Sequence, residues 1–207
     1  KIKLPLGPLE MMTGILERGV WPNGTRTSQL SARAALNLKE KSGETFEDID
    51  LLIHSSVCRD FLEPSTASVI HHELGLPSTT MIFDLSNACL GMMNALTVAA
   101  SMIETGQIRK ALIVSGENGG PLLEDTISGL LEKNESNQLT RKNIKKYIAN
   151  LTIGSAATAF IIGHKEDYPH AARILGGAVG TDSSANDLCQ GDGNSHSLMM
   201  ETDSEAL

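Results

Sequence analysis

The amino-acid sequence lacks any uninterrupted apolar run of about 18 residues, the length that a transmembrane helix needs, and its first ten residues lack the apolar core of a signal peptide. Cysteine is scarce as well. The 207 residues include three, Cys58, Cys89 and Cys189, and no two of them are spaced C-x-x-C. This scarcity disfavours a disulfide framework and a zinc site. We therefore expect a cytoplasmic protein with reduced thiols, no membrane span and no bound metal.

The chain has few positively charged residues. It contains 17 Lys and Arg residues but 25 Asp and Glu residues, so its net charge is −8 at pH 7. An acidic chain does not attract nucleic acid or an anionic membrane through its overall field, so we expect no nucleic-acid partner. One lysine cluster, at residues 142–146, goes against this trend. We interpret it as a solvated face, with contact to an anionic ligand as the alternative.

Signatures of several common enzyme classes are also absent. The chain contains no G-x-G-x-x-G of dinucleotide-binding folds, no G-x-x-x-x-G-K-[ST] of P-loop proteins and no G-x-S-x-G of serine hydrolases. None of the six histidines has the H-E-x-x-H spacing of a metalloprotease. We expect His54, at a predicted strand end, to be a satisfied polar group, and His71 and His72 to lie on a helix surface. No bound cofactor is expected.

What is present is an alternation of strands and helices, with a length that suggests one domain or a tight pair of subdomains. The predicted strands cover residues 50–55, 81–85, 111–115, 156–162 and 173–181, and the predicted helices cover residues 27–43, 64–74 and 90–104. The short spacings are typical of βαβ units, so we expect a mainly parallel, layered α/β sheet. Residues 117–150 are predicted to form a helical excursion on the surface, and residues 1–23 a loop with one short helical turn.

The segment from Phe83 to Gly91 joins a buried strand to a long helix through a polar turn, and this turn contains Cys89. The helix that follows is apolar on nearly every face, which is typical of a central helix. A thiol at a helix N-terminus lies near unpaired N–H groups and the positive end of the helix dipole, which favour the thiolate. The pattern therefore predicts that Cys89 is a nucleophile. The alternative is a small buried cysteine that serves only for packing.

Three segments resemble a known family. Residues 84–91, together with the strand after the helix, resemble the nucleophile region of the thiolase superfamily, above all the 3-oxoacyl-[acyl-carrier-protein] synthase III-like condensing enzymes. Residues 56–68 resemble one branch of that family, the head-to-head acyl-CoA condensing enzymes of bacterial long-chain olefin biosynthesis. Residues 151–157 resemble the entry to the last strand of the first half of the fold. The resemblance covers residues 24–191.

The resemblance implies a thiolase-like layered fold (α/β/α/β/α), of which this chain supplies mainly the N-terminal half. Residues 1–23 would be an N-terminal loop region, residues 24–170 the N-terminal half, and residues 171–207 the start of the connection to a C-terminal half that is largely absent. The family's catalytic histidine and asparagine lie in that second half, and no histidine here stands in the matching motif. We therefore expect this chain alone to be inactive, as part of a longer protein.

The resemblance also implies site residues, substrates and a partner. Cys89 occupies the position of the acyl-accepting cysteine, and its N–H would be one donor to the thioester oxyanion. Glu63 occupies the position of a glutamate that reaches across a homodimer as a base; without the resemblance, Glu63 would be an acidic residue ahead of a helix N-terminus. The implied activity is condensation of two long-chain acyl-CoA molecules. The alternatives are a decarboxylating synthase III, which uses an acyl-carrier protein thioester, and a non-catalytic partner subunit.

Overall fold

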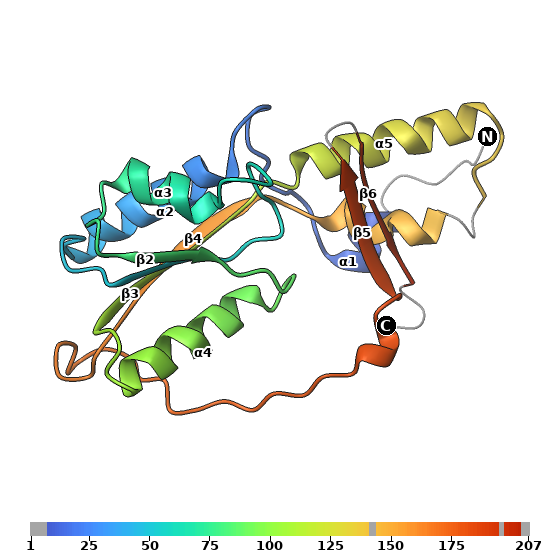
Figure 1. Ribbon diagram of the computed structural model, residues 1–207. Coiled ribbons are helices and arrows are strands. Elements are labelled where there is room, and N and C mark those ends of the chain that lie inside the picture. The colour runs from blue at the N-terminus through green and yellow to red at the C-terminus, as the bar shows by residue number, and fades with distance from the viewer. Residues whose placement is uncertain (1–7, 141–143, 195–196, 204–207) are drawn as a thin grey trace. The chain divides into compact units, whose positions relative to one another are not determined.

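The computed structural model describes residues 8–140, 144–194 and 197–203. The chain divides into two compact units, which are described separately. The larger unit, called the sheet unit here, contains residues 24–118 and 156–178. The smaller one, called the helix–hairpin unit, contains residues 1–23, 119–155 and 179–207. Figure 1 shows both units, with most of their helices and strands labelled.

A four-stranded sheet forms the centre of the sheet unit. Its strands are β1 (Leu51–His54), β2 (Met81–Asp84), β3 (Lys110–Glu117) and β4 (Ala156–Gly163), arranged in the order β2-β1-β3-β4. The first three are parallel, in a register that pairs Leu51 with Met81 and with Ala111. The last strand runs antiparallel to β3. The prediction of a mainly parallel α/β sheet is confirmed.

Three helices cover the sheet: α2 (Thr27–Ser42) and α3 (Thr66–Leu74) lie on one face, and α4 (Gly91–Glu104) lies on the other (Figure 1). Alternate strand residues point to opposite faces. Leu52 and Leu112 therefore pack in the cluster with α2 and α3, whereas Leu51 and Ile113 pack in the cluster with α4. Both faces of the central strands β1 and β3 are buried, which explains why the apolar residues in these two strands run consecutively rather than alternating.

Local signals in the sequence fix where these helices begin and end. The Ser65 side chain caps α3 by accepting a hydrogen bond from the Ser68 N–H, 3.2 Å away. Gly43 ends α2 and Gly75 ends α3, both in the left-handed conformation that glycine adopts without strain. These boundaries agree with the helices predicted over residues 27–43 and 64–74.

Close packing between α2 and β3 depends on Gly116. A Cβ atom at this position would lie 2.7 Å from the Ser31 Oγ and 2.8 Å from the Thr27 carbonyl oxygen. Both distances are shorter than van der Waals contact allows, so no larger residue fits without moving the helix.

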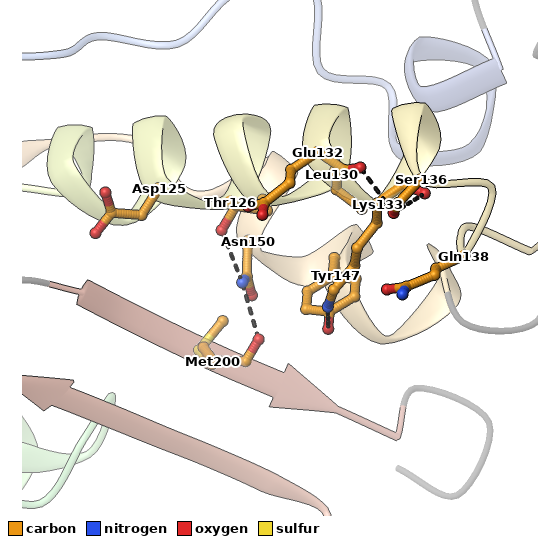
Figure 2. A pocket seen from close by; sticks show the side chains of 11 residues that line it. Asp125, Thr126, Leu130, Glu132, Lys133, Ser136, Gln138, Tyr147, Asn150 and Met200 are labelled. Atoms are coloured by element: carbon orange, nitrogen blue, oxygen red, sulfur yellow. Dashed lines mark hydrogen bonds between the residues drawn. The ribbon is translucent and has the colours of Figure 1, made fainter.

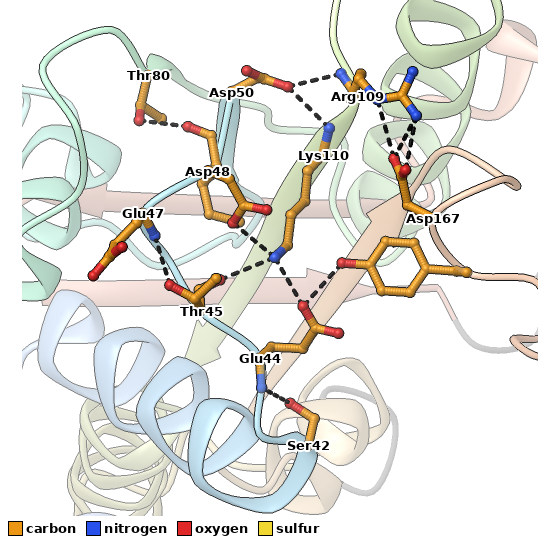
Figure 3. A network of polar contacts seen from close by, with 12 residues as sticks. Ser42, Glu44, Thr45, Glu47, Asp48, Asp50, Thr80, Arg109, Lys110 and Asp167 are labelled. Atoms are coloured by element: carbon orange, nitrogen blue, oxygen red, sulfur yellow. Dashed lines mark hydrogen bonds and ion pairs between the residues drawn. The ribbon is translucent and has the colours of Figure 1, made fainter.

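A polar network closes the amino-terminal edge of the sheet (Figure 3). The buried Lys110 ammonium lies 2.8 Å from a carboxylate oxygen of both Glu44 and Asp48. The Tyr168 hydroxyl donates to Glu44 at 2.9 Å. Burial by itself would lower the pKa of Lys110, but its hydrogen bonds to Asp48 and Glu44 outweigh burial and raise the pKa. Lys110 is therefore charged at neutral pH, and its role here is structural.

The helix–hairpin unit combines one long helix and several short ones with a two-stranded antiparallel hairpin. Its elements are α1 (Pro8–Thr13), α5 (Gly120–Glu135), η1 (Lys145–Tyr147), α7 (Ile148–Thr152), η2 (Ser183–Ala185), β5 (Cys189–Asn194) and β6 (Ser197–Thr202). Strand β6 contacts α5, η1 and α7. The excursion predicted over residues 117–150 is helical in α5, η1 and the start of α7, whereas Glu117 belongs to β3 and residues 136–140 lie outside the helices.

The strand predicted over residues 173–181 is wrong. These residues are exposed and form neither a helix nor a strand, and within the described residues no strand lies beside them to supply hydrogen bonds. The hairpin β5–β6 was not predicted, because β5 is polar and contains two glycines, which are unfavourable in a strand. In the lysine cluster, residues 142 and 143 lie outside the described part, and Lys146 forms an ion pair with Glu201 at 3.0 Å.

Candidate active site

Both predicted catalytic residues follow strands at the same edge of the sheet. Strands β1 and β2 are parallel neighbours, so their carboxyl ends meet at one edge. The segment after β1 contains Glu63, and the segment after β2 contains Cys89. Both residues are exposed, and the described residues include no hydrogen bond between the two side chains. The structure thus brings the two segments to one edge without joining the side chains directly.

The turn that carries Cys89 is tightly wound. The Leu90 N–H donates to the Asn87 carbonyl at 3.0 Å, and the Gly91 N–H donates to the Ala88 carbonyl at 3.2 Å. Ala88 has a φ of 44°, which a residue with a side chain rarely adopts. Cys89 is exposed two residues before α4 begins, and it forms an isolated β-bridge with Asn87. The choice between a nucleophile and a packing cysteine stays a prediction at this point.

Gly91 allows α4 to begin directly against the end of β1. A Cβ atom on Gly91 would collide with the Oγ of Ser55, which is buried. The close approach places the first turn of α4, and the Cys89 turn before it, at the carboxyl end of the sheet. With any larger residue at position 91, α4 would have to shift away from Ser55.

Two carboxylates hold the beginning and the middle of the segment that contains Glu63. Glu117, at the end of β3, accepts hydrogen bonds from the Val57 N–H at 2.7 Å and the Cys58 N–H at 3.2 Å. Asp60 accepts one from the Ser28 N–H at 3.1 Å, at the N-terminus of α2. The segment is therefore anchored at its beginning and middle, and its side chains at residues 61–63 are exposed.

Cys58 is chemically different from Cys89. Burial, followed by the negative charge of Glu117, raises the pKa of the Cys58 thiol from 9.0 to about 12. At neutral pH this thiol is protonated and unreactive. Cys189, in the helix–hairpin unit, is exposed, and its Sγ lies 3.7 Å from the Thr202 Oγ1.

Asp84 is a residue of this edge that the sequence motifs contained but did not single out. Its two carboxylate oxygens accept hydrogen bonds from the Thr66 N–H at 2.8 Å and the Ala67 N–H at 2.7 Å, at the start of α3. Burial would raise the pKa of the Asp84 carboxyl, but its hydrogen bond with His54 and those from the two N–H groups lower it. Asp84 is the last residue of β2 and lies 18 residues beyond Thr66, so the sequence gives no local signal of this contact.

His54, the last residue of β1, lies beside Asp84 in the sheet, because the two residues are paired in register. Its ring Nδ1 is 3.5 Å from the Asp84 Oδ1, and its side chain is 1% exposed. The ring Nε2 is buried and has no hydrogen-bond partner within the described residues. The expectation that His54 is a satisfied polar group is thus correct for one ring nitrogen and wrong for the other.

The helix–hairpin unit contains a separate cavity of about 410 Å³ (Figure 2). Its walls come from α5, Tyr147, Asn150 and Met200. Asn150 donates to the Thr126 Oγ1 at 3.1 Å and to the Met200 carbonyl at 2.9 Å. These bonds tie α5, α7 and β6 together, and the walls include none of the predicted catalytic residues.

The described residues include no group of three or more His, Cys, Asp or Glu side chains that could hold a metal ion. In the same part of the chain, no helix is both long and apolar enough to cross a membrane.

Comparisons with known proteins agree with this geometry. A family model described as 3-Oxoacyl-[acyl-carrier-protein (ACP)] synthase III matches residues 83–127. An acyl-CoA:acyl-CoA alkyltransferase from Xanthomonas campestris pv. campestris is 37% identical over 180 residues, 87% of this chain and 52% of that protein. A beta-ketoacyl-[acyl-carrier-protein] synthase III from Aliarcobacter butzleri is 44% identical over 115 residues, 55% of this chain and 34% of that protein.

A solved structure extends the likeness to three dimensions. The crystal structure of a cysteine-to-serine variant of Xanthomonas campestris OleA with bound lauric acid and lauroyl-CoA matches with a TM-score of 0.86 and 36% identity. The match covers 96% of this chain and 57% of that one.

The chain therefore has the thiolase-like fold of the synthase III-like condensing enzymes, as its sequence motifs predict. Within this class, it is similar in sequence and structure to the acyl-CoA:acyl-CoA alkyltransferase OleA. It spans about half the length of these relatives.

Proposed function

We propose that the protein containing this chain is an acyltransferase that condenses two long-chain acyl-CoA molecules into a β-ketoacyl product. The observation that carries the proposal is the exposed Cys89 in a strained turn between β2 and α4 of a thiolase-like fold. The similarity to acyl-CoA:acyl-CoA alkyltransferases supports acyl-CoA as the substrate.

Cys89 performs the first step. Its thiolate attacks the thioester carbonyl, the bond to CoA breaks, and CoA leaves as a thiol after taking up a proton. The Cys89 N–H, just before the N-terminus of α4, is one donor to the oxyanion. The product of this step is an acyl thioester on Cys89.

Glu63 performs the second step. Its carboxylate takes an α-proton from a second acyl-CoA, and the resulting carbanion attacks the acyl carbonyl on Cys89. A carbon–carbon bond forms, the Cys89 thiolate leaves, and the product is a β-ketoacyl-CoA. The exposure of Glu63 on a segment anchored at Val57 and Asp60 supports this role, because the side chain can extend toward a neighbouring subunit.

The working form is a homodimer that pairs β2 across a two-fold axis. In support, β2 is an edge strand with a neighbour only on its β1 side among the described residues, and Met81 is half exposed. Pairing two copies would continue one sheet and remove the open edge. Sedimentation of the complete protein at micromolar concentration should give a dimer, and a monomer would contradict this part of the proposal.

The acylation step has a direct test. Incubated with lauroyl-CoA, the complete protein should gain the mass of one lauroyl group on Cys89. Cys89→Ala should abolish the gain, and the control Cys189→Ala should keep it. An unmodified wild-type protein would contradict the proposal and favour a non-catalytic partner subunit.

A decarboxylating synthase III is the second candidate, and the family model over residues 83–127 together with the Aliarcobacter butzleri relative favours it. Such an enzyme would load Cys89 in the same way but would need malonyl-carrier protein as the second substrate. Product formation with malonyl-carrier protein, and none with a second acyl-CoA, would select this candidate.

A further inference from the structure

One carboxylate joins the two segments that carry the candidate catalytic residues. Asp84 is the last residue of β2, five residues before Cys89. Its side chain binds the N–H groups of Thr66 and Ala67 at 2.8 and 2.7 Å, and Thr66 comes three residues after Glu63. A helix N-terminus leaves such N–H groups without partners inside the helix, so Asp84 supplies the partners that α3 itself cannot.

The charge of Asp84 strengthens this contact. Hydrogen bonds to an ionised acceptor are about twice as strong as neutral ones, and a negative charge at a helix N-terminus is further stabilised by the dipole. The side chain is only 15% exposed, so water competes little for it. The next N–H along the helix, that of Ser68, already bonds to the Ser65 side chain.

The rest of the segment is held elsewhere. Glu117 binds its beginning, at Val57 and Cys58, and Asp60 binds its middle to the start of α2. After Glu63 the chain enters α3, and there Asp84 holds it through the Thr66 and Ala67 N–H groups. The Cys89 turn, in contrast, is held by its own backbone bonds and by the Leu85 N–H to His54 carbonyl bond of 2.9 Å.

We propose that Asp84 is a positioning residue: by binding the N-terminal N–H groups of α3, it fixes Glu63 for the condensation step, and acylation of Cys89 does not depend on it. This inference rests on the proposed function, in which Glu63 is the base. Loss of the Asp84 carboxylate would free the start of α3 and let the Glu63 segment shift, and the Cys89 turn would stay in place.

The test uses the complete protein with two substitutions that remove equivalent contacts. Asp84→Ala removes a carboxylate that binds two N–H groups beside the site. The control Asp50→Ala removes a carboxylate that binds the Arg109 and Lys110 N–H groups at 2.7 and 3.0 Å, at the opposite edge of the same sheet. Acylation by lauroyl-CoA and β-ketoacyl formation are measured separately, and acylation also reports that the variants are folded.

Asp84→Ala should slow condensation by about 10- to 100-fold and change acylation by less than about threefold, because a small misplacement of a catalytic group is costly. Asp50→Ala should change neither by more than about threefold. If Asp84→Ala does not fold, Asp84→Asn, which keeps one oxygen acceptor, should be used instead. It should also slow condensation more than acylation, but by a smaller factor. In the Glu63→Gln protein, adding Asp84→Ala should lower the condensation rate by less than a further factor of about three, since both changes act through Glu63.

Equal loss of acylation and condensation in Asp84→Ala would overturn the inference, as would a loss that multiplies with that of Glu63→Gln. A wild-type protein that fails to load or to condense acyl-CoA would overturn the proposed function instead, and the inference with it. The two failures are therefore distinguishable.

Discussion

The three cysteines should differ sharply in reactivity toward iodoacetamide, and the structure gives the size of the difference for Cys58. A rise in the pKa of this thiol from 9.0 to about 12 lowers its thiolate fraction at pH 8 by about 1,000-fold. A more basic thiolate is a better nucleophile. With a Brønsted coefficient of about 0.4–0.5, the higher pKa raises the rate constant of the Cys58 thiolate by roughly 25-fold, which partly offsets its smaller thiolate fraction. Cys58 should therefore react about 40-fold more slowly than an ordinary exposed thiol, before any steric protection is counted.

The measurement is peptide mapping by mass spectrometry after a limiting dose of iodoacetamide, on the folded complete protein at pH 8. We expect Cys89 to be labelled first, because it is exposed just before the N-terminus of α4. Exposure alone does not separate it from Cys189, which is the internal control for an ordinary exposed thiol. Labelling of Cys58 at a rate within a few-fold of Cys189 would refute the account of its environment, and labelling of Cys189 ahead of Cys89 would refute the choice of nucleophile.

Two further predictions concern the fold. Gly116→Ala should lower the free energy of unfolding by about 1–3 kcal/mol, because its Cβ would press on the Thr27 carbonyl and the Ser31 hydroxyl; an unchanged denaturation midpoint would contradict this packing. Lys110→Met should also destabilise the protein, by about 1–3 kcal/mol, because it leaves Glu44 and Asp48 without their shared cation. Since the ion pairs raise the pKa of Lys110, their contribution is fully present below its ordinary value of 10.5 and is lost as pH rises through the raised value, so wild type and variant should converge in strong alkali. The control Lys146→Met, at an exposed ion pair, should change stability little, and a wild-type advantage that grows with alkaline pH would contradict the assignment.

Periodicity in the sequence was sufficient to predict the elements that lie in the core. Strands β1 to β4 and helices α2 to α4 bury apolar residues at regular spacings, and glycine marks the ends of α2 and α3. The strand–turn–helix around Cys89 was predictable for the same reason. In each case the signal is local, since it lies within the element itself.

Contacts between distant segments could not be predicted in this way. The link from Asp84 to α3 joins residues 17 and 18 positions apart, and the link from Glu117 to Val57 joins residues 60 apart. Neither leaves a repeating pattern in the sequence. Residues 173–181 show the opposite error, a local signal without the predicted structure. Their apolar residues suggest a strand, yet no strand forms there and Leu175 is 93% exposed.

The division of labour between Cys89 and Glu63 is the central claim, and one variant tests it most directly. Glu63→Gln keeps the size of the side chain but cannot accept the α-proton. In single-turnover experiments with lauroyl-CoA, the complete Glu63→Gln protein should load one acyl group on Cys89 at the wild-type rate and then stall, with β-ketoacyl formation reduced by roughly 100-fold or more. The matched control is Glu73→Gln, an exposed glutamate on α3, which should leave both steps unchanged. Unimpaired condensation by the Glu63→Gln protein would contradict the account and leave Glu63 as a charge ahead of a helix.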